Sequence, residues 1–162
     1  MTTVKIKTTP ASDAWRNVMT AFTRVNTVLG REMSAEAAIS LDWYSILLML
    51  AQSEEASMRP SDLADQIGLS RSATTRLVDR LESEGLVERR SCASDRRGTF
   101  VRLTPKGAQV FTEAGRIHLR GIDEHVGSHL TNDELAQVAV LLGKLAHGVG
   151  GDALSVLNPA QP

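Results

Sequence analysis

The sequence predicts a mainly α-helical fold with one small β-hairpin, and three observations indicate it. Apolar residues recur at spacings of three and four along most of the chain, which is typical of amphipathic helices. Two short, partly alternating segments, 86–89 and 99–103, enclose a polar stretch that ends in glycine, as in a hairpin with a long tip. Finally, 42% of the residues are hydrophobic but only 4% are aromatic, so the core must be mainly aliphatic.

The composition limits the class of protein. A chain of 162 residues suits one domain. Its longest wholly apolar run, residues 46–51, is far shorter than the roughly 20 residues of a membrane span. No apolar stretch follows the N-terminal lysines, as it would in a secretory signal. Cys92 is the single cysteine and cannot form an internal disulfide. These features predict a cytoplasmic protein that is not associated with a membrane.

Six helices are expected, and each has a local signal. The first runs to about residue 33 after a polar arm; the second, residues 41–52, is apolar almost all round and therefore buried. The third opens at Pro60, which is preset for the first helical position, and ends at Gly68. A short extra strand before Pro60 would complete the sheet. The remaining caps are Ser12 for the first helix, Ser70 for the fourth, Thr104 for the fifth, and a capping box of Thr131 and Glu134 for the sixth.

The charge is unevenly distributed along the chain. Its net value is −1, but residues 71–106 hold nine basic and five acidic residues, so this window carries +4 and the rest −5. Concentrated positive charge on an acidic body attracts phosphate to one face. A solvated charged surface explains the same feature equally well.

The fourth helix has a polar face that suits nucleic acid. At 100° per residue, Thr75, Arg76 and Asp79 lie within about 60° of Ser72, while the apolar residues lie opposite. In the major groove of DNA, Arg can make two hydrogen bonds to guanine, and Ser or Thr can bond bases or phosphates. The preceding helix and the turn at Gly68 complete a helix-turn-helix. The hairpin tip, with Asp95, Arg96 and Arg97, could lay arginines into the minor groove.

These segments resemble the MarR family of winged helix-turn-helix bacterial transcriptional regulators. The resemblance is strong over residues 41–107. It lies in the fourth helix with its preceding turn (69–82), in Gly85-Leu86-Val87-Glu88-Arg89-Arg90, and most specifically in Asp95-Arg96-Arg97 followed by Val101-Arg102-Leu103-Thr104-Pro105-Lys106-Gly107. The flanks match only as a helix pattern.

The resemblance implies a winged helix-turn-helix lobe plus a helical dimerisation region. It further implies a homodimer that binds a pseudo-palindromic operator in double-stranded DNA, and repression relieved by a small molecule or by oxidation. The expected domains are a flexible arm (1–11), a dimerisation helix (12–40), the DNA-binding lobe (41–103), C-terminal dimerisation helices (104–150) and a flexible tail (151–162). The candidate DNA-binding residues are Ser70, Arg71, Ser72, Thr75, Arg76, Arg80, Asp95, Arg96 and Arg97.

Some family members sense a small molecule, and three aromatic residues are candidates for an effector site here. Trp15, Trp43 and Tyr44 could line a cleft for an aromatic acid, or they could simply pack in the core.

Where the family often has Thr or Ser before the third helix, this chain has Arg59, which could point at phosphate instead.

Redox and metal sensing are the alternatives within the same fold. Cys92 falls in the wing, where oxidation would disturb DNA binding, but an incidental exposed thiol is the simpler interpretation. His118, His125 and His129 fall on one helical stripe, and some family members bind zinc with histidines on this helix. A closed zinc site needs four ligands. Because Asp123 and Glu124 should point away from the stripe, the remaining ligands would have to come from elsewhere, such as Glu32 or Asp42. We therefore predict no metal site and no cofactor.

An enzyme is not expected. The sequence has no glycine-rich phosphate loop, nucleophile motif or strongly spaced metal-ligand cluster. A winged helix that binds protein without DNA specificity remains the other class of hypothesis. It would not need arginines on the wing tip or on the exposed face of the fourth helix.

Overall fold

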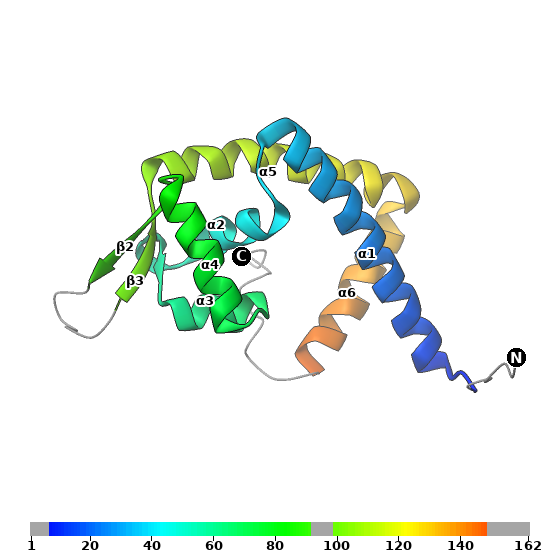
Figure 1. Cartoon of the computed structure of the whole chain (residues 1–162). Helices are drawn as coiled ribbons and strands as arrows, with labels where there is room; N and C mark the ends of the chain where they lie inside the picture. The colour runs from blue at the N-terminus through cyan, green and yellow to red at the C-terminus, as the bar shows by residue number, and fades with distance from the viewer. Residues whose placement is uncertain (1–6, 92–98, 149–162) are drawn as a thin grey trace, which may run out of the picture.

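The computed structural model describes residues 7–91 and 99–148, and it confirms the predicted mainly helical fold with a small sheet (Figure 1). The short strand expected before Pro60 is present as β1. In chain order the elements are α1 (Pro10–Ala37), α2 (Leu41–Gln52), the 3-10 helix η1 (Glu54–Ala56), β1 (Ser57–Met58), α3 (Pro60–Ile67), α4 (Arg71–Ser83), β2 (Val87–Ser91), β3 (Thr99–Leu103), α5 (Pro105–His125), the 3-10 helix η2 (Gly127–His129) and α6 (Asn132–Gly148).

The first helix begins earlier than the sequence predicted. Its N-cap is Thr9 and not Ser12: the Thr9 side chain accepts from the Ser12 N–H, and the Ser12 hydroxyl accepts from the Thr9 N–H. Pro10 takes the first helical position, where its missing N–H costs nothing, so the cap falls on the residue before it. The helix continues to Ala37, and Ala38 ends it in the left-handed conformation, with φ 52°.

The other predicted caps are confirmed. Ser70 accepts from the Ala73 N–H at 3.2 Å, and Thr104 accepts from the Gly107 N–H at 2.9 Å. At the sixth helix, Glu134 accepts from the Thr131 N–H at 2.8 Å. Each cap satisfies backbone donors that the first helical turn leaves without partners.

The sheet is antiparallel with the strand order β1-β3-β2. Val101 in the central strand β3 pairs with Met58 on one side and Arg89 on the other. Because Val101 is fully buried, the sheet packs one face against the helices of the lobe.

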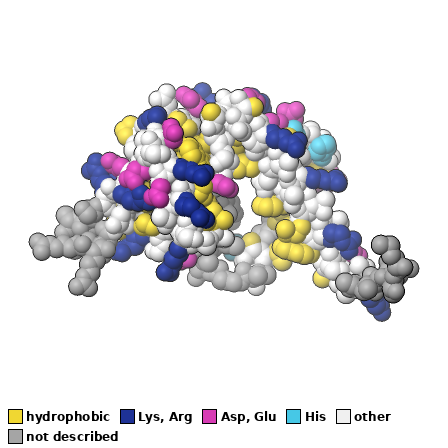
Figure 2. Space-filling model, viewed as in Figure 1, with side chains coloured by type: hydrophobic (Ala, Val, Ile, Leu, Met, Phe, Trp, Pro, Cys, Tyr) yellow, Lys and Arg dark blue, Asp and Glu magenta, His cyan; other side chains and the backbone are white. Residues whose placement is uncertain are grey.

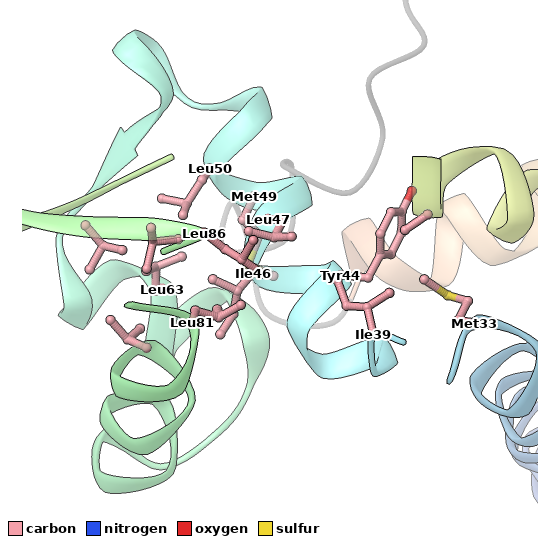
Figure 3. Close-up of a cluster of buried hydrophobic side chains, with 14 residues drawn as sticks. Met33, Ile39, Tyr44, Ile46, Leu47, Met49, Leu50, Leu63, Leu81 and Leu86 are labelled. Carbon is pink, nitrogen blue, oxygen red and sulfur yellow. The ribbon is translucent and has the colours of Figure 1, made fainter. Parts of the chain in front are cut away.

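One hydrophobic core joins α2, α3, α4 and the sheet into a lobe, and it continues toward α1 and α5 (Figure 3). Leu47 and Leu50 of α2 are fully buried beside Leu63 of α3 and Leu81 of α4. At the other end of α2, Tyr44 approaches Met33 of α1. In contrast, α6 buries none of its residues.

No single helix in the described ranges is long and apolar enough to cross a membrane; only α1 and α2 taken together, bent by 83°, reach the necessary length and composition.

Candidate DNA-binding surface

A tight turn presents α4 beside α3. Gly68 ends α3 with φ 70°, a conformation that glycine adopts without steric cost, and Ser70 then caps α4. The two helices pack side by side across this turn. The predicted helix-turn-helix is therefore present.

The inner face of α4 is buried as the helical spacing predicted. Val78 and Leu81 are inaccessible to solvent and belong to the lobe core. Thr74 is also buried, and its hydroxyl donates to the Ser70 carbonyl at 3.2 Å, so the buried hydroxyl has a partner. This packing fixes which side of α4 faces outward.

The outer face of α4 carries polar and basic side chains that are all exposed. They are Arg71, Ser72, Thr75, Arg76, Asp79 and Arg80. The Thr75 hydroxyl donates to the Arg71 carbonyl at 2.8 Å, which leaves its oxygen lone pairs available to an outside donor. Figure 2 shows several Lys and Arg side chains over the lobe that contains α3 and α4, with Asp and Glu side chains among them. This face can therefore approach an anionic surface.

An ion-pair cluster that the sequence analysis did not identify ties β2 to α4. The Arg89 guanidinium donates to Asp79 at 2.6 Å and also pairs with Glu82. Glu82 additionally accepts from the Arg89 backbone N–H at 2.8 Å. Burial by itself would lower the pKa of Arg89. The hydrogen bonds to Asp79 and Glu82 outweigh this effect, so the pKa of Arg89 is raised. The cluster fixes α4 relative to the base of the hairpin, while the Asp79 side chain remains 56% exposed.

The base of the hairpin is also held from α3. The Arg59 guanidinium lies 5.0 Å from the centre of the Phe100 ring on β3, within the range of a cation–π contact. Arg59 is itself exposed, and the expectation that it points at phosphate stays a prediction. Asp95, Arg96, Arg97 and Cys92 fall outside the described residues.

The aromatic residues proposed for an effector site do not come together in one chain. Tyr44 is only 7% exposed and stacks on Phe111 of α5, with ring centroids 5.5 Å apart; Trp43 is partly buried beside it. Trp15, in contrast, is 57% exposed and lies near the start of α1, whereas α2 follows the other end of that helix (Figure 1). Ala37 follows Trp15 by 22 positions, which is roughly 33 Å of helix.

The histidine stripe is also broken. His118 lies 4.7 Å from Tyr44 between ring centroids, and burial lowers its pKa, just as burial raises the pKa of Tyr44. His125 instead contacts Glu32 of α1 at 2.6 Å. The expected alignment of His129 with these two is wrong, because α5 ends at His125 and His129 belongs to η2.

The start of α5 is tied to the end of α4. Thr104 donates to the Leu86 carbonyl through its backbone N–H at 3.1 Å and through its hydroxyl at 3.0 Å. The Lys106 ammonium donates to the Glu84 carbonyl at 2.6 Å. Gly107 packs directly against the same turn, since a Cβ there would lie 2.0 Å from the Leu86 oxygen. The first turn of α5 is therefore fixed to the turn that follows α4.

Residues 39–99 match the model of the MarR family. Three solved structures resemble the whole fold. Sco3205 of Streptomyces coelicolor, a MarR family transcriptional regulator in complex with DNA, is 27% identical with a TM-score of 0.79, and the match covers 94% of this chain and 96% of that one. AbsC of the same organism, also a MarR family transcriptional regulator, is 27% identical with a TM-score of 0.78, and the match covers 90% of this chain and 98% of that one. A mutant MarR from E. coli complexed with operator DNA is 27% identical with a TM-score of 0.71, and the match covers 80% of this chain and 91% of that one.

Proposed function

We propose that this chain, a transcriptional regulator of the MarR family and not an enzyme, is a dimeric repressor that binds a pseudo-palindromic operator and is released by a small effector. The observation that carries the proposal is the outward face of α4. It presents Arg76, Thr75 and Ser72, all exposed, on a helix whose other face is locked into the lobe core.

We assign the major groove to α4. A helix fits this groove, and Arg76 at its exposed centre can make two hydrogen bonds to a guanine edge. Ser70, Arg71 and Ser72 lie at the N-terminal end, where backbone N–H groups and the helix dipole favour phosphate. Arg80 continues the basic face by a further turn. Asp95, Arg96 and Arg97 are assigned to the minor groove by resemblance, with Asp95 holding Arg97.

The dimer is supported by apolar surface that one chain leaves in water. On α1, Trp15 is 57% and Phe22 63% exposed; on α6, Leu141 is 62% exposed. A shallow groove of about 530 Å³ runs along α1 past Trp15 and Met19. Figure 2 shows hydrophobic side chains near α1 and α6, along the hollow that separates these helices from the lobe. Apolar patches of this kind mark association surfaces, and a second copy would bury them by symmetry.

Effector release is supported by how the lobe connects to the dimer helices. Trp43 and Tyr44 lie where α2 meets α5, and the start of α5 is bonded to the turn that follows α4. A ligand that favours one α2–α5 arrangement would change the separation of the two recognition helices and lower operator affinity. Aromatic acids are the first candidates.

Operator affinity at several salt concentrations tests the proposal. Arg76→Ala should weaken operator binding by about 1–3 kcal/mol and relax the preference at one base pair in each half-site. Arg97→Ala should weaken binding and reduce the salt slope by about one unit per lost phosphate contact. Half-sites should repeat about 10 base pairs apart, as two symmetry-related helices require.

The control is Thr112→Ala, on an exposed part of α5 away from the assigned surface, which should leave affinity unchanged. If neither arginine substitution changes affinity, the surface assigned to DNA is wrong. A winged helix that binds protein would then be the better interpretation.

A further inference from the structure

A cluster of metal-ligating side chains lies where α1 crosses α5, away from the DNA-binding surface. Glu32 comes from α1, and Glu124 and His125 come from the last turn of α5. One ligand atom from each residue lies within 4.8 Å of the other two. In the closest pair, His125 Nε2 and Glu32 Oε1 are 2.6 Å apart.

The Glu32 carboxylate is only half satisfied. Its Oε1 pairs with His125, whereas its Oε2 is fully buried and has no hydrogen-bond partner among the described residues. Leaving a buried acceptor unpaired is unfavourable, especially on a charged group. The Oε2 atom would be satisfied if a cation lay in the cluster.

The backbone leaves room for this carboxylate. Gly121 is buried one turn before His125, and a Cβ there would lie 2.8 Å from Glu32 Oε2 and 2.4 Å from Leu29. Any side chain at this position would push the carboxylate away from α5. The glycine therefore lets Glu32 enter the helix–helix contact.

The nearby arginine does not neutralise the cluster. Arg120 donates to Glu36 at 2.6 Å, one turn further along α1, and this bond is the main cause of its raised pKa. The charges of Glu32 and Glu124 also raise the pKa of Arg120, but more weakly. Two carboxylates and an imidazole thus remain together without a guanidinium of their own in the described part of the chain.

We propose that Glu32, Glu124 and His125 bind one divalent transition-metal ion of the Zn²⁺ class, which joins α1 to α5. A mixed imidazole and carboxylate set suits zinc, whereas Mg²⁺ and Ca²⁺ prefer oxygen ligands only. Bonds of about 2.0–2.2 Å in a tetrahedral site place ligands roughly 3.3 Å apart. Rotation of the exposed Glu124 side chain can bring its carboxylate to that distance, and the 2.6 Å hydrogen bond between His125 and Glu32 must open to it. Three protein ligands leave the fourth position to water.

Zinc titration of the full-length protein, stripped of metal by chelator and dialysis, tests this site without DNA. Calorimetry should give one Zn²⁺ per chain, and Co²⁺ used as a probe should give the visible absorption of a tetrahedral ion. Glu32→Gln and His125→Gln should each weaken zinc binding by about 100-fold, since loss of a mere supporting group already costs roughly 10–100-fold. Mg²⁺ should not compete.

Glu36→Gln is the matched control, because it removes a carboxylate that bridges the same two helices outside the cluster. It should bind zinc like the unmodified protein, as should Arg76→Ala, so failure of the DNA assignment would not affect this result. Glu124→Gln changes an exposed side chain and keeps the test valid if Glu32→Gln does not fold. Absence of zinc binding, or equal binding by all three ligand variants, would overturn the proposal.

Discussion

Gly107→Ala should destabilise this protein, although a glycine-to-alanine change inside a helix normally stabilises by about 1 kcal/mol. The added Cβ would lie 2.0 Å from the Leu86 carbonyl oxygen and 2.9 Å from Leu103 Cδ1. Contacts below 3.0 Å essentially never occur for real Cβ atoms. The first turn of α5 must therefore move by about 1 Å or more from the turn that follows α4.

The cost of that movement follows from the bonds that it breaks. The Leu86 oxygen accepts from the Thr104 N–H at 3.1 Å and from the Thr104 hydroxyl at 3.0 Å, and both bonds would be lost or stretched. Each contributes about 1 kcal/mol, and forced packing adds about 1–3 kcal/mol. After the gain in helix propensity, the net loss should be about 3 kcal/mol, or roughly 6–12 °C in Tm for a chain of this size.

Urea unfolding followed by far-ultraviolet circular dichroism, at one fixed protein concentration, measures this loss. Gly115→Ala is the matched control: it lies in the same helix, and its Cβ would meet Tyr44 Oη at 3.6 Å, an ordinary contact. It should leave stability unchanged or raise it by up to about 1 kcal/mol. If Gly107→Ala were as stable as Gly115→Ala, the close approach between α5 and the turn would not exist as described.

Two further predictions concern the dimer surface and pH. Leu142→Asp, on the exposed face of α6, should convert the dimer to monomers and weaken operator binding with it; a monomeric unmodified protein in light scattering at micromolar concentration would contradict the dimer. Lowering the pH from about 7 to about 5 should reduce the free energy of unfolding. Burial keeps the pKa of His118 in the folded protein below its ordinary value, so the unfolded chain takes up the proton first. His118→Gln should lose less free energy of unfolding between these two pH values than the unmodified protein, as measured by urea unfolding. Equal losses in the two proteins would mean that His118 is not the group responsible.

The elements of this fold could be predicted because their signals are local. The caps Ser70, Thr104 and Thr131 act within one helical turn of themselves, and glycine ends α3 by its own conformation. The outward face of α4 follows from helical spacing alone, since the lobe core takes the apolar side. Where two local signals competed, as at Thr9 and Ser12, the prediction chose the wrong residue because Pro10 shifts the helix start.

Several groupings of residues could not be judged from the sequence because they depend on distance in space. A helical wheel aligned His129 with His125, but it could not show that α5 ends between them. Trp15 was grouped with Trp43 by residue type, although α1 carries it to the opposite end of a long helix. The contact of Arg59 with Phe100 was not predicted, because nothing in the sequence places these two residues together.

The sequence by itself determined the order of the helices, the helix-turn-helix and the hairpin, because periodicity, caps and turn residues act over a few positions. Only the tertiary structure decided which charged and aromatic groups meet: Arg89 with Asp79 and Glu82, Arg59 with Phe100, and Glu32 with His125. The last pair is separated by 93 positions. Such contacts depend on the crossing of whole elements, which is set by the burial of the common core rather than by any local spacing.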